Sequence, residues 1–194
     1  MVSYPLAALV TAGSGGLAAS HLPLLYYRAE AGHGVLRGHM ARANPQWREV
    51  SPGSKALAIF GGAQHYISPN WYPSKQEHRK VVPTWNYVVV HAHGTLSIRN
   101  EPEWLLENVR ALSDVHESTS DAPWQVADAP PEFIENLLKA IVGVELTITK
   151  LEGKWKVSQN RPVSDRQGVI RGLESLASPE ALEMAALVKA NLTK

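Results

Sequence analysis

One stretch, residues 84–98, constrains the fold of this chain more than any other because it carries the longest strand signal in the sequence. Its side chains alternate between two faces. One face carries Trp85, Tyr87, Val89 and His91, and the other carries Asn86, Val88, Val90 and Ala92. Since apolar residues occur on both faces, we expect both to be at least half buried. The core of the protein is therefore predicted to contain a β-sheet.

Shorter strand signals occur on both sides of this long one. The predicted strands are residues 6–12, 17–27, a strand ending at Arg37, 56–60, 64–68, 144–150 and 154–157. A Gly-rich hairpin turn at residues 13–16 joins the first two, and Pro23 indicates an edge or an interruption in the second. Gly61-Gly62 is predicted to break a strand, and residues 151–153 to form a turn. Another polar turn is expected at residues 28–34.

Helices are predicted from start signals followed by apolar stripes. The start signals are Glu101-Pro102, Pro131, a capping box of Ser164 and Gln167, and Ser178 followed by Pro179. The helix that starts near Pro131 is expected to end at Gly143 as its C-cap. Residues 69–80 and 113–129 are predicted to be irregular.

The order of these elements indicates the fold class. Strands come first, then two helices, a hairpin and further helices, which predicts an α+β protein built on an antiparallel sheet or barrel. We find no internal repeat and no clear linker. Residues 1–194 are therefore predicted to form a single domain, with C-terminal helices from about 163–194.

Composition excludes several classes of function. With 44% hydrophobic and 19% charged residues, the chain has the composition of an ordinary globular protein, and its formal charge of +1 creates no strong field for nucleic acid or membrane. The absence of cysteine excludes disulfides, thiolate catalysis, iron–sulfur clusters and cysteine-based zinc sites. No apolar run approaches the roughly 20 residues that span a bilayer. A cytoplasmic protein without membrane partners is expected.

A polar cluster lies at a predicted strand end in residues 36–47, LRGHMARANPQW. Arg37 and Arg42 can form forked hydrogen bonds with a phosphate, and Gly38 permits close approach of the backbone. Asn44 can cap the turn that follows. Taken alone, the stretch is more typical of a solvated strand end with a capped turn than of a phosphate site. The other polar clusters in the chain shift this interpretation toward a ligand site.

Three further stretches combine aromatic rings with hydrogen-bond donors. They are SPNWYPSK at residues 68–75, PTWNY at 83–87 and QNR at 159–161. An aromatic heterocycle with a phosphate tail would use such residues. Taken singly, Trp71 and Trp85 are more typical of a core or an interface, and Lys75 of a solvated charge run.

His91 and His93 are the residues that come nearest to a metal site. Because they lie two apart on a predicted strand, they share one face. Two ligands are too few, and no carboxylate is adjacent in the sequence. No metal site is predicted. Nor does the sequence contain a GxGxxG-type phosphate loop or a clear helix-turn-helix.

These stretches together resemble the PaiB family of FMN-binding negative transcriptional regulators. The resemblance rests on SHLPLL at residues 20–25, LRGHMARANPQW at 36–47, YISPNWYPSK at 66–75, VPTWNYVVVHAHG at 82–94, LLKAIVGVEL at 137–146 and LEGKWKVSQNRP at 151–162. It implies an FMN-binding split β-barrel of the pyridoxamine-phosphate-oxidase-like type with flanking helices, usually a homodimer with flavin at the subunit interface.

The resemblance also implies which residues bind FMN. Those expected along the ribityl and phosphate side are Arg37, Gly38, His39 and Met40, with Arg42 and Asn44 nearby. Further phosphate candidates are Ser68 and Lys75, with Trp71 and Tyr72 close to the ligand. Those expected to approach from the barrel or the partner subunit are Thr84, Trp85, Asn86, Gln159 and Arg161.

Three functions remain open from the sequence. The first is repression of genes such as those for sporulation and degradative enzymes, which the family resemblance implies and which makes DNA a partner. The second is an enzyme, a small FMN-dependent oxidoreductase or flavin reductase, since split barrels host that chemistry. The third is a module that binds haem, through His91 or His93, or another ligand. Family members usually have an N-terminal segment before the first strand, and this chain is expected to start almost at that strand.

Overall fold

The structure of the chain, a computed structural model, describes residues 1–29 and 32–192. It contains two compact units, Met1–Phe60 with His91–Glu152 and Gly61–Val90 with Gly153–Lys194. Residues 30–31 of the predicted turn at 28–34 and residues 193–194 of the predicted C-terminal helices lie outside the described residues. Each unit has buried apolar residues of its own, and the single domain predicted over residues 1–194 stays a prediction.

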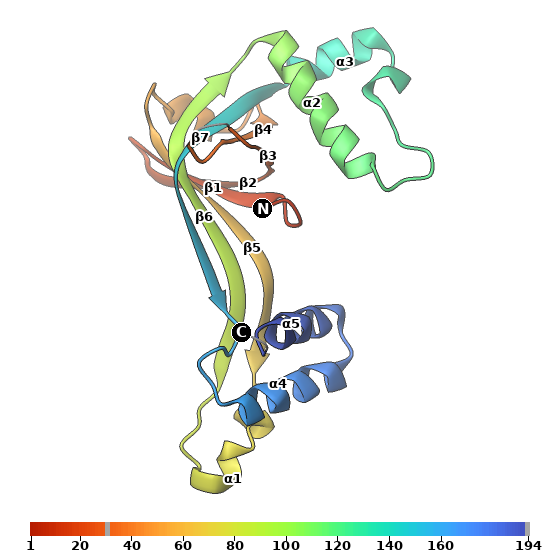
Figure 1. The fold of residues 1–194 in the computed structure, drawn as a ribbon. Coiled ribbons are helices and arrows are strands. Elements are labelled where there is room, and N and C mark those ends of the chain that lie inside the picture. Colours follow the sequence, from red (N-terminus) through yellow and green to blue (C-terminus); the bar gives the residue numbers. More distant parts are fainter. Residues whose placement is uncertain (30–31, 193–194) are drawn as a thin grey trace. The chain divides into compact units, whose positions relative to one another are not determined.

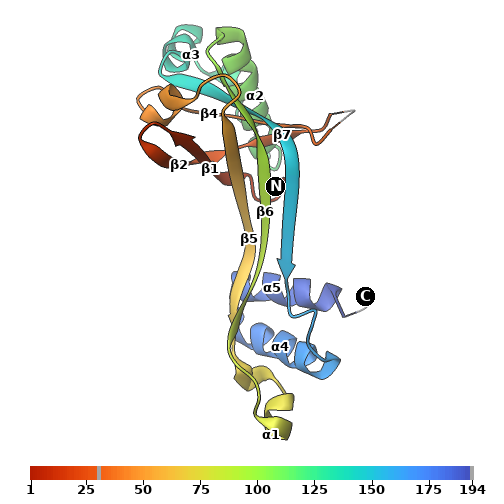
Figure 2. The ribbon, with the colours of Figure 1, turned by 90° about the vertical axis from the view of Figure 1, so that its left-hand side faces the viewer.

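Among the described residues, seven strands form one sheet in the order β2-β1-β5-β6-β7-β4-β3 (Figure 1). Their bounds are β1 Leu6–Gly13, β2 Gly16–Pro23, β3 Leu25–Tyr27, β4 Val35–Ala41, β5 Lys55–Ile67, β6 Thr84–Arg99 and β7 Ile141–Lys156. The predicted hairpin is confirmed, because β1 and β2 pair antiparallel and Gly13 lies opposite Gly16. The predicted interruption near Pro23 is confirmed by the gap between β2 and β3. Strands β5, β6 and β7 lie side by side and supply residues to both units (Figure 2).

The first unit adds two α-helices to its strands, α2 (Pro102–Glu117) and α3 (Pro131–Leu138), and the 3-10 helices η1 (Pro45–Glu49) and η3 (Val126–Asp128). Helix α2 starts where predicted, with proline in its first turn, where a missing N–H costs no hydrogen bond. Its buried Leu105 and Leu112 lie on one stripe, as the sequence predicts. Other buried residues of this unit include Ala7, Leu9, Leu36, Ala58, Phe60, Ala92, Leu96, Val142, Val144 and Leu146.

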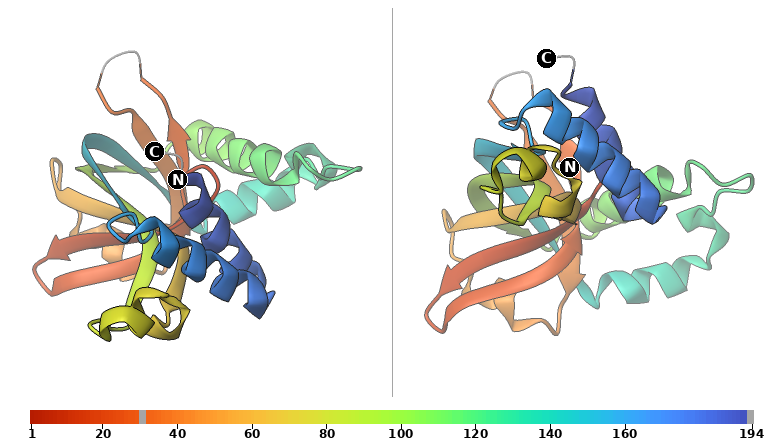
Figure 3. Two further views of the ribbon diagram at one scale, coloured as in Figure 1. Left: turned by 60° about the horizontal axis from the view of Figure 1, so that its bottom comes forward. Right: turned by 90° about the horizontal axis from the view of Figure 1, so that it is seen from below.

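The second unit contains α1 (Ser74–His78), α4 (Val163–Leu176), α5 (Pro179–Ala190) and the 3-10 helix η2 (Pro69–Trp71). Helices α4 and α5 pack side by side (Figure 3). The predicted cap of α5 is confirmed, since the Ser178 hydroxyl accepts a hydrogen bond from the Ala181 amide at 3.2 Å. The core of this unit contains Ala63, Ile67, Tyr72, Val157, Val169, Ile170, Leu173, Ala181, Met184, Ala185 and Val188.

Two predicted strand ends are wrong, and both involve glycine. Strand β5 runs through Gly61-Gly62 without a break. Strand β7 runs through the predicted turn at residues 151–153, so residues 154–157 do not fold back as a second strand. Glycine permits an extended backbone as readily as a turn, and pairing with neighbouring strands decides between them. Both strands are therefore longer than their local sequence indicates.

Two helix signals are also wrong. Helix α3 ends at Leu138, and Gly143, its predicted C-cap, lies in β7, where a Cβ would be 2.2 Å from the Trp104 ring. Phe133, an apolar residue of α3, is 55% exposed. Helix α4 has Pro162 as its N-cap without a capping hydrogen bond, so the capping box of Ser164 and Gln167 does not form.

The segments predicted to be irregular contain helical turns. Residues 69–80 include η2 and α1, and residues 113–129 include the end of α2 and the short η3. In the described part of the chain, no helix has both the length and the apolar character needed to cross a membrane.

Candidate functional site

Arg37 lies in β4, and its guanidinium forms an ion pair within the first unit. Its Nε donates to Glu145 Oε2 at 2.7 Å, and Arg99 donates to the other carboxylate oxygen at 2.5 Å. The Arg37 guanidinium lies 4.9 Å from the centre of the Tyr27 ring and 5.7 Å from that of Trp104. Burial opposes ionisation of Glu145, but the hydrogen bonds from Arg99 and Arg37 outweigh it, and the pKa of Glu145 lies below its ordinary value.

The next three residues of β4 are buried to different degrees. Gly38 leaves room for another strand, because a Cβ there would lie 2.6 Å from the Pro23 carbonyl oxygen. Met40 belongs to the core. Asn108 Nδ2 donates to His39 Nδ1 at 3.3 Å, and burial lowers the pKa of His39. Neutral imidazole, which can accept this hydrogen bond, is thus favoured.

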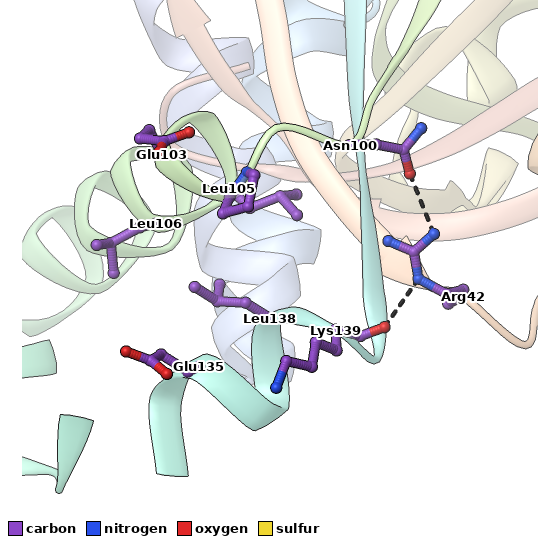
Figure 4. Close-up of a pocket in the computed structure, with 9 residues that line it drawn as sticks. Arg42, Asn100, Glu103, Leu105, Leu106, Glu135, Leu138 and Lys139 are labelled. Carbon is purple, nitrogen blue, oxygen red and sulfur yellow. Dashed lines mark hydrogen bonds between the residues drawn. The ribbon is translucent and has the colours of Figure 1, made fainter. Parts of the chain in front are cut away.

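Arg42 connects the end of α3 to the strands beside it. Its guanidinium donates to the Lys139 carbonyl at 2.8 Å and to Asn100 Oδ1 at 3.1 Å (Figure 4). It also donates to the Ile141 carbonyl at 2.8 Å. Asn44 caps η1, as the sequence predicts, by accepting from the Gln46 amide at 2.9 Å. Arg42 thus satisfies the carbonyl of Lys139, the C-cap of α3, and that of Ile141 at the start of β7.

A groove of about 450 Å³ lies beside Arg42, between α2 and α3. Its residues are Arg42, Asn100, Pro102, Glu103, Leu105, Leu106, Glu135, Leu138 and Lys139. Two carboxylates border it, and the guanidinium of Arg42 is used by the protein itself (Figure 4). The groove therefore suits a phosphate poorly.

In the second unit, the residues of the 68–75 stretch mainly hold their own segment in place. Ser68 caps η2 by accepting from the Asn70 amide at 3.2 Å, and Lys75 Nζ donates to Asn70 Oδ1 at 2.5 Å. Trp71 packs against α4, where a Cβ on Gly172 would lie 2.2 Å from the indole. The Trp71 ring is thus a packing surface within this unit.

Tyr72 and Arg161 come together in this unit. Tyr72 is only 2% exposed, and the Arg161 guanidinium lies 4.8 Å from the centre of its ring. Burial raises the pKa of Tyr72. Among the described residues its hydroxyl has no hydrogen-bond partner. Gln159 is occupied locally, since it accepts from the Val157 amide at 2.8 Å.

The PTWNY stretch divides into a buried and an exposed part at the start of β6. Asn86 is fully buried and donates to Ser158 Oγ at 2.9 Å. Thr84 Oγ1 accepts from Lys156 Nζ at 2.7 Å. Trp85, by contrast, is 48% exposed. Of the three predicted residues, Trp85 presents the most surface to a ligand, and Asn86 the least.

Trp85 borders a second groove, of about 390 Å³, which lies wholly within the second unit. Its residues are Gly61, Gly62, Gln64, Trp85, Tyr87, Val88 and Val89. The indole Nε1 of Trp85 donates to Gln64 Oε1 at 3.2 Å, and the Tyr66 ring stands edge-on to the indole at 6.2 Å. A Cβ placed on Gly61 would meet nothing within 4 Å, so no side chain covers the strand backbone at this residue. We call this feature the Trp85 groove.

The cation of Lys156 lies near Tyr87, one of the residues of the Trp85 groove. Lys156 Nζ is 6.0 Å from the centre of the Tyr87 ring and is held by Thr84. The sequence did not indicate Lys156 as a site residue, because a turn was predicted just before it, at residues 151–153. Nor were Gly61 and Gly62 indicated, although glycine inside a strand often marks close approach of a ligand.

A sheet with flanking helices and a groove with aromatic side chains in its wall form a fold and a site of the kind that binds small molecules. Residues 1–150 match the family described as "Putative FMN-binding domain". The chain is 35% identical to "Protease synthase and sporulation protein PAI 2" of Bacillus subtilis, covering 96% of this chain and 86% of that protein. An uncharacterized protein of Emericella nidulans is 34% identical, over 88% of this chain and 80% of that one.

The chain therefore belongs to the FMN-binding family described by that model, and the resemblance to the PaiB family is confirmed. Among solved structures, the FAD and haem binding protein from Mycobacterium smegmatis has a similar fold, with a TM-score of 0.55 and 16% identity over 80% of this chain and 67% of that one. The predicted α+β split-barrel fold with flanking helices is thus confirmed.

Proposed function

We propose that this protein binds FMN and that the flavin-bound form regulates gene expression. The single observation that carries the flavin proposal is the Trp85 groove, in which bare strand backbone at Gly61 lies beside an exposed indole. A flat isoalloxazine ring needs close backbone approach and an aromatic or apolar wall. The groove volume of about 390 Å³ falls within the range of small-molecule sites, which is roughly 300–1,000 Å³.

Lys156 would hold the phosphate end. Its ammonium group lies beside Tyr87 at the groove and is already positioned by Thr84 at 2.7 Å. The family resemblance favours other phosphate ligands, namely Arg37, Ser68 and Lys75, and these remain predictions. In the structure, Arg37 donates to Glu145. Ser68 accepts from the Asn70 amide, and Lys75 donates to the Asn70 side chain. When bound, FMN would supply redox chemistry, and the protein would orient the ring and shield one of its faces.

We further propose a homodimer in which a second copy covers the exposed side of the Trp85 groove. Trp85 and Tyr66 are 48% and 44% exposed, and such large exposed side chains in one patch favour a protein partner. The regulatory role is supported by the name of the Bacillus subtilis relative, a protease synthase and sporulation protein. DNA is the proposed target of that regulation, and a cytoplasmic location goes with it.

Titration of the purified protein with FMN, followed by flavin fluorescence, tests the cofactor. Trp85→Ala is expected to weaken binding about tenfold, since loss of a stacking ring costs roughly 1–3 kcal/mol. The matched control is Trp124→Ala, which removes another exposed indole from the other unit. Lys156→Ala and Lys75→Ala distinguish the two phosphate assignments. If neither tryptophan variant changes the affinity, the flavin ring does not lie in the Trp85 groove.

A second set of measurements separates regulator from enzyme. A regulator should select specific fragments from a DNA library and should form a dimer by light scattering. Substrate-dependent NAD(P)H oxidation above the free-flavin rate, without DNA selection, would instead indicate an oxidoreductase. A Soret band in the purified protein would indicate haem.

A further inference from the structure

Three side chains from two adjacent strands gather on one face of the first unit. His91 and His93 lie on β6, and Glu152 lies near the end of β7. In the described part of the chain, one ligand atom of each lies within 4.8 Å of the ligand atoms of the other two. None of the three is among the residues of the Trp85 groove, so this cluster is separate from the proposed flavin site.

The geometry of the sheet brings these side chains together. Residues two apart on a strand point to the same face, and the rings of His91 and His93 have centres 6.4 Å apart. Strand β7 is the neighbour of β6 in the sheet (Figure 2), and it continues through Gly153, which keeps Glu152 on the strand. As a result, Glu152 Oε2 lies 2.7 Å from His93 Nε2.

We propose that His91, His93 and Glu152 bind a divalent transition metal of the zinc class. Two imidazole nitrogens and one carboxylate oxygen form a set of ligands that suits Zn²⁺, Co²⁺ or Ni²⁺. Mg²⁺ and Ca²⁺ prefer sites made mainly of oxygen ligands, so two histidines select against them. Three protein ligands leave at least one coordination position open to water or to another ligand.

Small movements of the side chains suffice to form the site. Zinc–ligand bonds of about 2.0–2.1 Å in a tetrahedron place ligand atoms roughly 3.4 Å apart. Since the three ligand atoms lie within 4.8 Å of one another, no pair needs to approach by more than about 1.4 Å, and the His93–Glu152 pair at 2.7 Å must separate by about 0.7 Å. Side-chain rotation can supply this, since the side chains of His93 and Glu152 are 38% and 48% exposed. The metal would take the place of the contact between His93 Nε2 and Glu152 Oε2.

Lys150 acts as a positioning residue for Glu152. Its ammonium group donates to Glu152 Oε1 at 2.8 Å, which leaves Oε2 for the metal. Thr149 Oγ1 in turn donates to the backbone carbonyl of His93 at 3.3 Å, which ties the two strands together at the site. Hydrogen bonds of this kind orient metal-binding carboxylates in many proteins.

Titration of chelator-treated full-length protein with Co²⁺ and Zn²⁺ tests the site, with Co²⁺ absorption bands and isothermal calorimetry as readouts. We expect one ion per chain, and at least about tenfold weaker binding in His93→Ala and in Glu152→Gln. His21→Ala removes an exposed strand histidine elsewhere in the first unit and should leave the affinity unchanged.

Two results would overturn the proposal. One is the absence of saturable binding by the wild-type protein, which would leave the cluster as an ordinary exposed ion pair. The other is equal affinity in wild type, His93→Ala and Glu152→Gln, which would place the metal elsewhere. Far-UV circular dichroism of each variant guards against loss of fold. Because flavin binding is measured separately by fluorescence, failure of the metal site leaves the proposed function untouched.

Discussion

Replacement of Glu145 by glutamine tests whether Arg37 stabilises the fold or is available to a ligand. The Glu145 side chain is 9% exposed and accepts hydrogen bonds from both Arg37 and Arg99. Glutamine has nearly the same shape, so packing is preserved. It removes the negative charge, however, and places two guanidinium groups around an amide whose NH2 group cannot accept from either of them.

The expected loss of unfolding free energy is about 2 kcal/mol. Removal of one partner from a fully buried ion pair costs roughly 3–5 kcal/mol. The side chains of Arg37 and Arg99 are 34% and 38% exposed, so water can solvate each guanidinium in part. We therefore expect about half of the loss in unfolding free energy that a fully buried ion pair would give. For a chain of this length, the midpoint of thermal unfolding should fall by roughly 4–8 °C.

The loss should depend on pH in a defined direction. Because the pKa of Glu145 in the folded protein lies below the ordinary value of 4.5, folding stabilises its ionised form. This contribution is fully present above the ordinary pKa and disappears as the pH falls through the lower pKa of the folded state. The difference between wild type and Glu145→Gln should thus be constant near neutral pH and should shrink in acid.

Urea unfolding followed by tryptophan fluorescence measures both quantities. Glu183→Gln is the matched control, since it removes an exposed carboxylate from α5, and it should change stability by less than about 0.5 kcal/mol. If Glu145→Gln is as stable as wild type at neutral pH, the ion pairs contribute nothing measurable. Arg37 would then be a stronger candidate for a phosphate ligand than Lys156.

Two further substitutions test contacts that the structure assigns to packing. Arg42→Ala removes hydrogen bonds to the carbonyls of Lys139 and Ile141 and should lower the unfolding free energy by roughly 1–3 kcal/mol, with FMN affinity in fluorescence titrations unchanged. Gly172→Ala places a methyl group 2.2 Å from the Trp71 indole, so thermal unfolding monitored by circular dichroism should show a loss of about 1–3 kcal/mol. A neutral result for either substitution would mean that the contact is not maintained in solution.

Local signals in the sequence predict the regular elements well where one physical cause dominates. The long alternation at residues 84–98 corresponds to β6, and Pro102 and Ser178 mark the starts of α2 and α5. In each case the stabilising interaction lies within a few residues of the signal. The partners of the polar side chains could not be predicted in this way. Glu145 lies 108 positions from Arg37, and only the register of β4 against β7 places them opposite each other.

Both proposed sites depend on the two strands whose lengths were predicted wrongly. A break at Gly61-Gly62 would have left no bare, extended backbone beside Trp85, and a turn at residues 151–153 would have removed Glu152 from the strand beside His93. Glycine lowers the local preference for a strand, yet it is tolerated when neighbours on each side supply hydrogen bonds. The same lack of a side chain leaves room for a ligand at Gly61. Gly61 is therefore a position where substitution by valine should preserve the sheet, because a Cβ there meets nothing within 4 Å, and should still abolish FMN binding in the fluorescence titration.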